Sequence, residues 1–279
     1  MTLVVDPESV RLRQLVAAEW SKLWSLRSTA WVLGVGALTV LGINVNAAVS
    51  NADRLARQPP PPSGSSVLPE MVFDPLHTAF VEPAWQLLIV LTAAVGGAVV
   101  FGEYASGLIR TTFAAVPDRR ALVAAKVVVV SAVMLVFGAV VSGASFGITQ
   151  GVLRDHGGLS PGDPGALRAV AAGALLAPVC ALVGMAVGAV VRHPAASVGA
   201  VVAVLVLLPA LFQGERHRWV KEIGNAMPLS AWRRLVVNPE RTHGLGKYPL
   251  TVAEAWIVYG AWAVVAVAVA VWVVGRRDV

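Results

Sequence analysis

Six long apolar stretches dominate this chain, and short polar segments separate them. Gly, Ala, Val and Leu make up the stretches almost without charge, and each is close to the roughly 20 residues that a helix needs to cross a bilayer. A helix also satisfies its own backbone polar groups, which lipid requires. We therefore predict an all-α, polytopic membrane protein with six transmembrane helices, at residues 30–50, 83–101, 127–148, 167–191, 197–212 and 255–274.

Composition supports a membrane protein and argues against a nucleic-acid-binding one. Hydrophobic residues make up 57% of the 279 residues and charged residues only 14%, whereas soluble domains are about a quarter charged. The net charge of +6 comes from short segments between the apolar stretches, so we interpret it as a set of topology signals. The single cysteine, Cys180, excludes a disulfide or a cysteine metal cluster within one chain.

Lys and Arg in the connecting segments predict the orientation. Three segments are basic: residues 1–29, the connection between spans two and three, and the tail at residues 275–279. We therefore expect a protein of the cytoplasmic membrane with both termini in the cytoplasm. The connection at residues 213–254 disagrees, because this orientation places it outside although it carries seven positive residues. Either the fifth span is misread, or this connection is a structured external element; we favour the second interpretation, with two short helices. The seven residues are Arg216, Arg218, Lys221, Arg233, Arg234, Arg241 and Lys247.

The segment before the first span predicts an amphipathic helix on the inner membrane surface. Asp6 and Pro7 suit the start of a helix, as a cap and as the first helical residue. Beyond them, one face carries apolar residues and the other carries mostly polar ones. The apolar positions are Leu12, Val16, Trp20 and Leu23, and the polar ones are Arg11, Gln14, Lys22 and Ser25. Thr251 and Glu254 form a capping box that opens the last span.

The connection at residues 101–120 predicts an amphipathic hairpin between spans two and three. Gly102 and Gly107 permit a bend where the chain leaves the membrane, Pro117 ends the first helical piece, and Asp118 can cap the next helix. A short cytoplasmic element that joins two spanning helices is a suitable place for another protein to push.

Two segments resemble permease subunits of type 2 export-class ABC transporters, especially those of high-GC Gram-positive bacteria. They are Glu-Tyr-Ala-Ser-Gly-Leu-Ile-Arg-Thr-Thr at residues 103–112 and Glu-Trp-Ser-Lys-Leu-Trp-Ser-Leu-Arg-Ser at residues 19–28. The resemblance implies an interfacial N-terminal helix, a coupling helix between spans two and three, and external re-entrant helices between spans five and six. It also implies contact with a separate ATPase subunit through Trp20, Lys22, Glu103, Gly107, Arg110 and Thr111.

Such a chain is the membrane-spanning half of an ATP-driven exporter and is not itself an enzyme. It has no G-x-x-x-x-G-K-[ST] motif, so ATP and Mg²⁺ are expected in the partner ATPase. A second permease copy, as a homodimer, and membrane lipid are the other expected partners, and no cofactor, metal or catalytic residue is expected in the chain. Because the spans lack internal charge, an apolar or amphipathic substrate fits best. The family's architecture suggests a path along spans one, two and five, past Asn44, Gln86 and Phe212.

Other interpretations of the same residues stay open at this stage. The chain could be a non-transporting membrane anchor or sensor that recruits cytoplasmic proteins through the same surfaces. Gly143 to Gly147 matches G-x-S-x-G and would make Ser145 the nucleophile of an intramembrane serine hydrolase. Glu103 and Arg110 could be charges that only flank the bilayer. Gly143 with Gly147, and Gly184 with Gly188, form spacings that let helices approach closely.

Overall fold

The computed structural model describes residues 7–25, 27–57, 74–105, 107, 118–239 and 247–276, with side chains from residue 12 onward. These residues form helices joined by short connections, and they include no strand. The elements are α1 (Pro7–Ser25), α2 (Arg27–Arg57), α3 (Pro75–Ala79), α4 (Glu82–Ala105), α6 (Arg119–Val152), η2 (Arg154–His156), α7 (Ala166–Val191), α8 (Pro194–Val202), η3 (Ala203–Leu207), α9 (Leu208–Leu211), α10 (Arg218–Asn225), α11 (Pro228–Val236) and α12 (Val252–Arg276).

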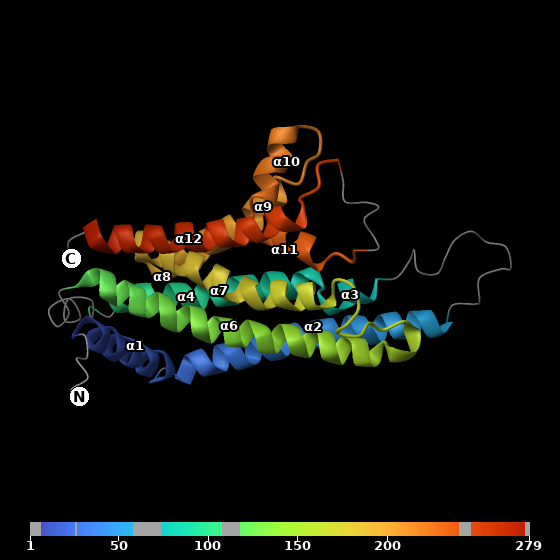
Figure 1. The fold of residues 1–279 in the computed structure, drawn as a ribbon, viewed down its shortest axis with the longest axis horizontal. Coiled ribbons are helices and arrows are strands. Elements are labelled where there is room, and N and C mark those ends of the chain that lie inside the picture. The colour runs from blue at the N-terminus through green and yellow to red at the C-terminus, as the bar shows by residue number, and fades with distance from the viewer. Residues whose placement is uncertain are drawn as a thin grey trace, which may run out of the picture.

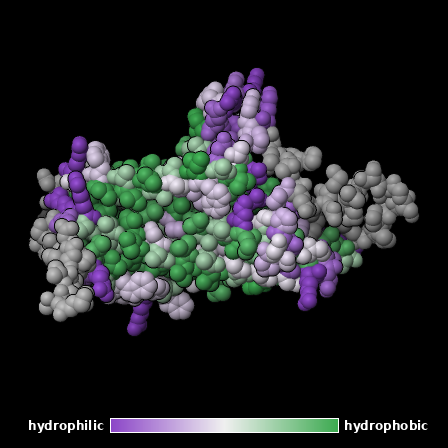
Figure 2. All heavy atoms as spheres, viewed as in Figure 1, coloured by the Kyte–Doolittle hydropathy of each residue, from purple (hydrophilic) through white to green (hydrophobic). Residues whose placement is uncertain are grey.

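The six predicted spans are confirmed as long apolar helices. Among the described residues, α2, α3 with α4, α6, α7, α8 with α9, and α12 are each long and apolar enough to cross a membrane. They lie side by side in one bundle, with both termini at the same end, which we call the termini end (Figure 1). On the face seen in Figure 2, mostly apolar residues cover the middle of the bundle, and hydrophilic residues gather at its two ends and on the projection formed by α10. The chain is therefore a multi-pass membrane protein.

Helix α7 forms the centre of the bundle. In its most apolar stretch 78% of the residues are buried, against 22% to 56% in the other five spans. It packs closely against α4 because glycines replace side chains at the crossing. A Cβ at Gly184 would overlap the carbonyl oxygen of Ala93, and a Cβ at Gly96 would overlap that of Ala181. The contact between α4 and α7 is thus a contact between backbones, as expected for helices that associate in lipid.

The two predicted small-residue pairs have different roles. Gly184 and Gly188 both face the backbone of α4. Gly143 and Gly147 are exposed on α6, and a Cβ at either would meet nothing within 4 Å. The spacing alone does not distinguish the two pairs, since both occur in long helices rich in Ala and Val.

The fifth span is irregular because it contains Pro209. This residue cannot donate to the carbonyl of Leu205, four residues earlier, and its ring crowds that carbonyl. The helix responds by widening into the π-helical turn η3 directly before it. Pro178, in contrast, lies inside α7 without ending that helix.

The short helix α3 precedes α4 and is held by side chains of its neighbours. Gln150 of α6 donates from Nε2 to the carbonyl of Pro75 at 2.8 Å, and Ser145 of α6 donates from Oγ to that of Ala79 at 2.7 Å. The amide of Val81 donates to Oδ1 of Asn44 on α2 at 3.1 Å. Asp74 caps the start of α3, accepting from the amide of Leu76 at 3.0 Å. These contacts satisfy backbone groups at a break between two helices, which a membrane-embedded break requires.

The basic connection at residues 213–254 contains α10 and α11, and several of its cations have partners. Arg218 binds Glu222 at 2.7 Å, Lys221 binds Glu215 at 3.1 Å, and Arg233 binds Glu82 of α4. Trp232 of α11 also stacks on Trp85 of α4, with ring centroids 5.6 Å apart. A positive charge that is paired within the fold is a weak topology signal, so these contacts give a physical reason for the excess of Lys and Arg in this connection.

The predicted capping boxes and caps next to the spans are present. The amide of Thr251 donates to Glu254 at 2.8 Å, and the amide of Glu254 donates back to Thr251 at 3.2 Å. Asp118 caps α6 by accepting from the amides of Arg120 and Ala121 at 3.0 and 3.1 Å.

We predict that Gly184→Ala destabilises the protein and that the matched variant Gly143→Ala does not. The added methyl group overlaps the backbone of α4 in the first case and enters open space in the second. The loss should fall within the roughly 1–3 kcal/mol typical of overpacking. Thermal unfolding of both variants in the same detergent measures the difference, and equal melting temperatures would contradict the close packing of α4 on α7.

Candidate functional site

A cluster of four charged side chains lies at the termini end of the bundle. Lys126 of α6 places its Nζ 2.7 Å from Oε2 of Glu19 on α1 and 2.7 Å from Oε1 of Glu103 on α4. Lys22 of α1 places its Nζ 2.9 Å from Oε1 of Glu19 and 3.0 Å from Oε1 of Glu103. We call Glu19, Lys22, Glu103 and Lys126 the charge cluster. It connects three helices that are far apart in the sequence.

Helical spacing explains how these residues meet. In α1, Leu15, Glu19 and Leu23 are four residues apart and all are buried, so Glu19 lies in the face that packs on the bundle. Glu103 lies in the last turn of α4, and Lys126 lies in the third turn of α6. The connection at residues 106–117 joins the ends of α4 and α6, so the cluster lies beside both ends of that connection.

Burial makes the pairing in this cluster obligatory. Glu19, Glu103 and Lys126 are 4%, 8% and 5% exposed, so two carboxylates and an ammonium are removed from water. A buried charge whose partner is removed typically costs about 3–5 kcal/mol. The cluster contains two negative and two positive groups, and its formal charge is zero. It therefore fixes α1 to α4 and α6 with high geometric specificity.

Lys22 lies at the edge of the cluster, where its side chain is 47% exposed. Partial burial alone would lower the pKa of Lys22, but hydrogen bonds and charges from Glu19 and Glu103 outweigh it and raise this pKa above the ordinary lysine value. A raised lysine pKa means that the ion pairs stabilise the fold at neutral pH. Their contribution is lost only as the solution becomes strongly alkaline and the ammonium deprotonates.

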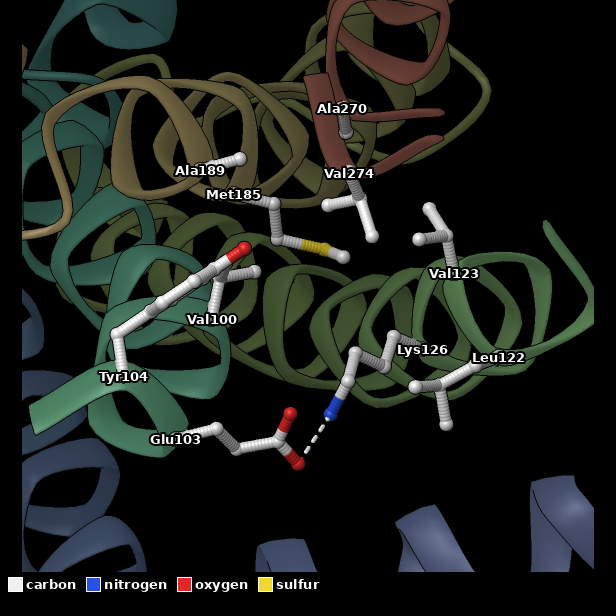
Figure 3. Close-up of a pocket in the computed structure, with 10 residues that line it drawn as sticks. All are labelled: Val100, Glu103, Tyr104, Leu122, Val123, Lys126, Met185, Ala189, Ala270 and Val274. Carbon is white, nitrogen blue, oxygen red and sulfur yellow. Dashed lines mark hydrogen bonds and ion pairs between the residues drawn. The ribbon is translucent and has the colours of Figure 1, made fainter. Parts of the chain in front are cut away.

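A small cavity lies beside the charge cluster, between α4, α6, α7 and α12 (Figure 3). It measures about 20 Å³, which is room for about one water molecule. Most of its lining is apolar, including Val100, Met185 and Val274. Tyr104 also lines it, and the guanidinium carbon of Arg192 lies 4.5 Å from the centre of the Tyr104 ring. No substrate of drug size fits here, so this end of the bundle is built to connect helices.

The structure brings together two of the six residues that the resemblance assigns to ATPase contact. Lys22 and Glu103 form a direct ion pair, and Glu103 is part of a buried charge cluster. Trp20 is 49% exposed on another face of α1, beside Trp24, with ring centroids 5.9 Å apart. Gly107 has φ +72, a left-handed conformation that glycine adopts easily, and its amide bonds the carbonyl of Tyr104. Arg110 and Thr111 lie outside the described residues.

The sequence analysis did not assign a role to two members of the cluster, Glu19 and Lys126. The signal for Glu19 was its position between Leu15 and Leu23 at helical spacing, where a charge interrupts a buried face. Lys126 belongs to the basic connection that we interpret as a topology signal, and Leu122 and Val123, one turn before it, are buried in the structure. Two complementary charges, each on an otherwise apolar helix face, are therefore the sequence feature that could have predicted this ion pair.

The three residues proposed for a substrate path have different surroundings. Asn44 is fully buried and binds the amide of Val81, so it has a structural contact. Gln86 donates to Oε1 of Glu82 at 2.7 Å. Phe212 ends α9, and its carbonyl is so close to Gly224 that a Cβ there would overlap it. None of the three lines the cavity beside the charge cluster.

A second polar cluster lies at the opposite end of the bundle, where α4 meets α11. Arg233 donates from Nε to Oε2 of Glu82 at 2.9 Å and from Nη2 to Oε1, so the pair is bidentate. Gln86 binds the same carboxylate. The side-chain oxygen of Gln213, in the amide orientation that its neighbours require, lies 3.2 Å from Nη1 and Nη2 of Arg233. The cluster joins the start of α4 in span two to elements that follow span five.

Ser145 does not have the surroundings of a nucleophile elbow. That motif places its serine on a sharp turn between a strand and a helix, with a histidine base in reach. Here Ser145 lies within the continuous helix α6, is fully buried, and donates its hydroxyl proton to the carbonyl of Ala79. The geometry favours a structural role for this serine. Within the described residues, no group of three or more His, Cys, Asp and Glu side chains is arranged to hold a metal ion.

We predict that Lys126→Met strongly destabilises the protein, because it leaves Glu19 and Glu103 buried and facing each other. The expected loss is about 3–5 kcal/mol, measured by thermal or denaturant unfolding in detergent. The control Arg120→Met removes an exposed cation two turns earlier in the same helix and should change the stability by less than about 0.5 kcal/mol. Equal stability of the two variants would mean that the charge cluster does not hold α1 in place.

The comparisons with known proteins leave the family open. A scan against protein-family models gives no match, and a search of curated proteins gives no significant match.

Proposed function

We propose that this chain is the membrane-spanning permease subunit of an ATP-driven exporter, with a separate ATP-binding-cassette ATPase bound at the termini end. The observation that supports this most is the charge cluster. It ties α1, the end of α4 and the start of α6 into one unit beside the connection at residues 106–117. Such a joint suits an ATPase that pushes on α1 and on this connection.

The mechanism follows from the way charges hold helices together. A force applied to α1 reaches α4 and α6 directly, because the pairs of Glu19 and Glu103 with Lys126 are short and buried. Breaking a buried pair is unfavourable, so the three helices move together rather than separately. Closure of two ATPase subunits would then tilt the spans and open a path through a homodimer. The ATPase supplies the Mg²⁺-bound ATP.

The substrate class follows from the distribution of charge in the spans. The charged groups near the ends of the spans, such as Glu82, Glu103 and Lys126, bind each other or other parts of the chain, and the face between the two ends seen in Figure 2 is mostly apolar. An apolar or amphipathic compound can move along such a surface without losing strong hydration. We propose outward movement of such a compound across the cytoplasmic membrane.

We predict that Trp20→Ala weakens binding of the ATPase without loss of fold. Trp20 is half exposed on α1, away from the charge cluster, so its removal leaves the bundle core intact. An exposed tryptophan that becomes an interface anchor contributes about 2 kcal/mol or more, or roughly 30-fold in affinity. Co-purification with a candidate ATP-binding-cassette ATPase from the same cells, together with ATP-dependent export in reconstituted vesicles, measures the effect.

The control for this experiment is Trp31→Ala, which removes a 73% exposed tryptophan from α2. Binding and export that persist in Trp20→Ala would remove α1 from the ATPase contact. A complex that binds the ATPase but moves no compound in any condition would favour the alternative, a non-transporting anchor or sensor that recruits cytoplasmic proteins.

We predict that the termini end lies in the cytoplasm. A cysteine at Ser160, an exposed position in the loop between α6 and α7 at the opposite end, should react with a membrane-impermeant thiol reagent in intact cells. A cysteine at Gln14, exposed on α1, should react only after the membrane is broken. The native Cys180 is fully buried and serves as the unreactive background. The reverse labelling pattern would invert the orientation and separate the charge cluster from any cytoplasmic ATPase.

A further inference from the structure

An apolar groove runs along the membrane-spanning part of α7, α8 with η3, and α12. It has a volume of about 320 Å³ and is lined by valines and alanines, with Trp262 the one aromatic residue among them. The indole N–H of Trp262 donates to the carbonyl of Ala226 at 2.7 Å, so this residue brings no unpaired donor to the groove. Val204 lines the groove from the π-helical turn η3, a type of irregularity that often marks functional sites.

Polar residues lie beyond the groove at the termini end, on two of the elements that line it. On α12, Arg276 follows the groove residue Val269 by seven residues, which is two helical turns on one face. His193 is the N-cap of α8 and precedes the groove residue Ala200 by seven residues, so it lies at the start of the helix that lines the groove. Both Arg276 and His193 are exposed. The groove is therefore apolar along the membrane-spanning part, and a positively charged rim made by Arg276 and His193 lies at one membrane surface.

The two rim residues suit a phosphate group. The guanidinium carbon of Arg276 lies 5.2 Å from the centre of the Trp272 ring, so the side chain rests on an aromatic surface at the end of the bundle. His193 accepts the amide of Ala196 at Nδ1, at 3.4 Å. A neutral histidine with Nδ1 as acceptor carries its hydrogen on Nε2, where it can donate to an anion.

We propose that this groove and rim form a binding site for an anionic phospholipid, with one acyl chain along Val204 and Trp262 and the phosphate at Arg276 and His193. The complementarity has two parts. The groove offers apolar surface over the depth that hydrocarbon occupies, and the rim offers positive charge and a hydrogen-bond donor at the depth of the headgroup. This site is separate from the charge cluster and does not depend on the proposed transport.

The size of the groove favours an acyl chain over a helix of a second copy. A helix is about 10–12 Å across, so only some of its side chains could enter a groove of about 320 Å³. An extended acyl chain is much thinner and can follow the whole length of such a groove. Lipid binding and dimer formation, measured on the same variants, distinguish a bound lipid from a second copy in this groove.

The test measures lipid binding to the purified, delipidated chain in detergent, by native mass spectrometry during titration with phosphatidylglycerol or phosphatidylcholine. Val204→Trp fills the groove and should weaken binding of phosphatidylglycerol at least tenfold. Arg276→Gln should weaken phosphatidylglycerol about fivefold, the effect of one cation near a membrane surface, and weaken phosphatidylcholine less, because its choline offsets the phosphate charge. Ala200→Leu is a milder filling variant that gives the same answer if Val204→Trp does not fold.

Matched controls come from α2, which lies outside the groove. Leu38→Trp adds the same bulk to an exposed apolar position, and Arg27→Gln removes an exposed cation at the same end of the bundle. Both should bind the two lipids like the unmodified chain. Unchanged phosphatidylglycerol binding in the groove variants would overturn the proposal. So would a loss of dimer in Val204→Trp without any change in lipid binding, because that result would assign the groove to a second copy.

Discussion

The contact between the backbones of α4 and α7 is the constraint on which the rest of the bundle depends. Glycines at 96, 184 and 188 remove the side chains that would separate the two helices. In lipid, burying apolar surface gives no hydrophobic stabilisation, so helices associate through van der Waals contact. The close approach of two backbones increases that contact. With α7 fixed against α4, the helices α6 and α12 pack on its remaining faces, and α2 and α8 complete the outside.

Charge is confined to the two ends of this bundle, and at both ends it connects elements that packing alone would leave loose. The termini end has the charge cluster, which attaches α1. The opposite end has the bidentate pair of Glu82 with Arg233, which attaches α11 to α4. Both sites use carboxylates from α4, one at its start and one in its last turn. The same helix therefore contacts the surroundings of both membrane surfaces, and a movement of α4 along its axis would disturb both sites together.

The sequence predicted the spans well because their signal is physical and local. In a chain that crosses lipid, long uncharged stretches form spanning helices, because a helix satisfies its own backbone groups. The caps at Asp118 and Thr251 depend only on neighbouring residues. The charge cluster was predicted in part, since Lys22 and Glu103 were chosen but not as partners of each other. Their pairing depends on how α1 packs against α6, which no local pattern encodes. Asn44 shows the same limit: a polar residue in a span can line a path, bind a backbone or do both, and the contact with Val81 depends on how α2 packs beside the break before α4.

The helix α3 has a consequence for the biogenesis of the protein. Ser145 and Gln150 on α6 satisfy carbonyls of α3, and Asn44 on α2 accepts the amide of Val81 just after it, so this break depends on a helix made before it and on one made after it. During synthesis α3 leaves the ribosome before α6 exists. A segment with unsatisfied carbonyls is unstable in hydrocarbon, so before α6 inserts we expect α3 in the headgroup region or inside the insertion machinery. Insertion of span three is then the event that allows span two to reach its final form.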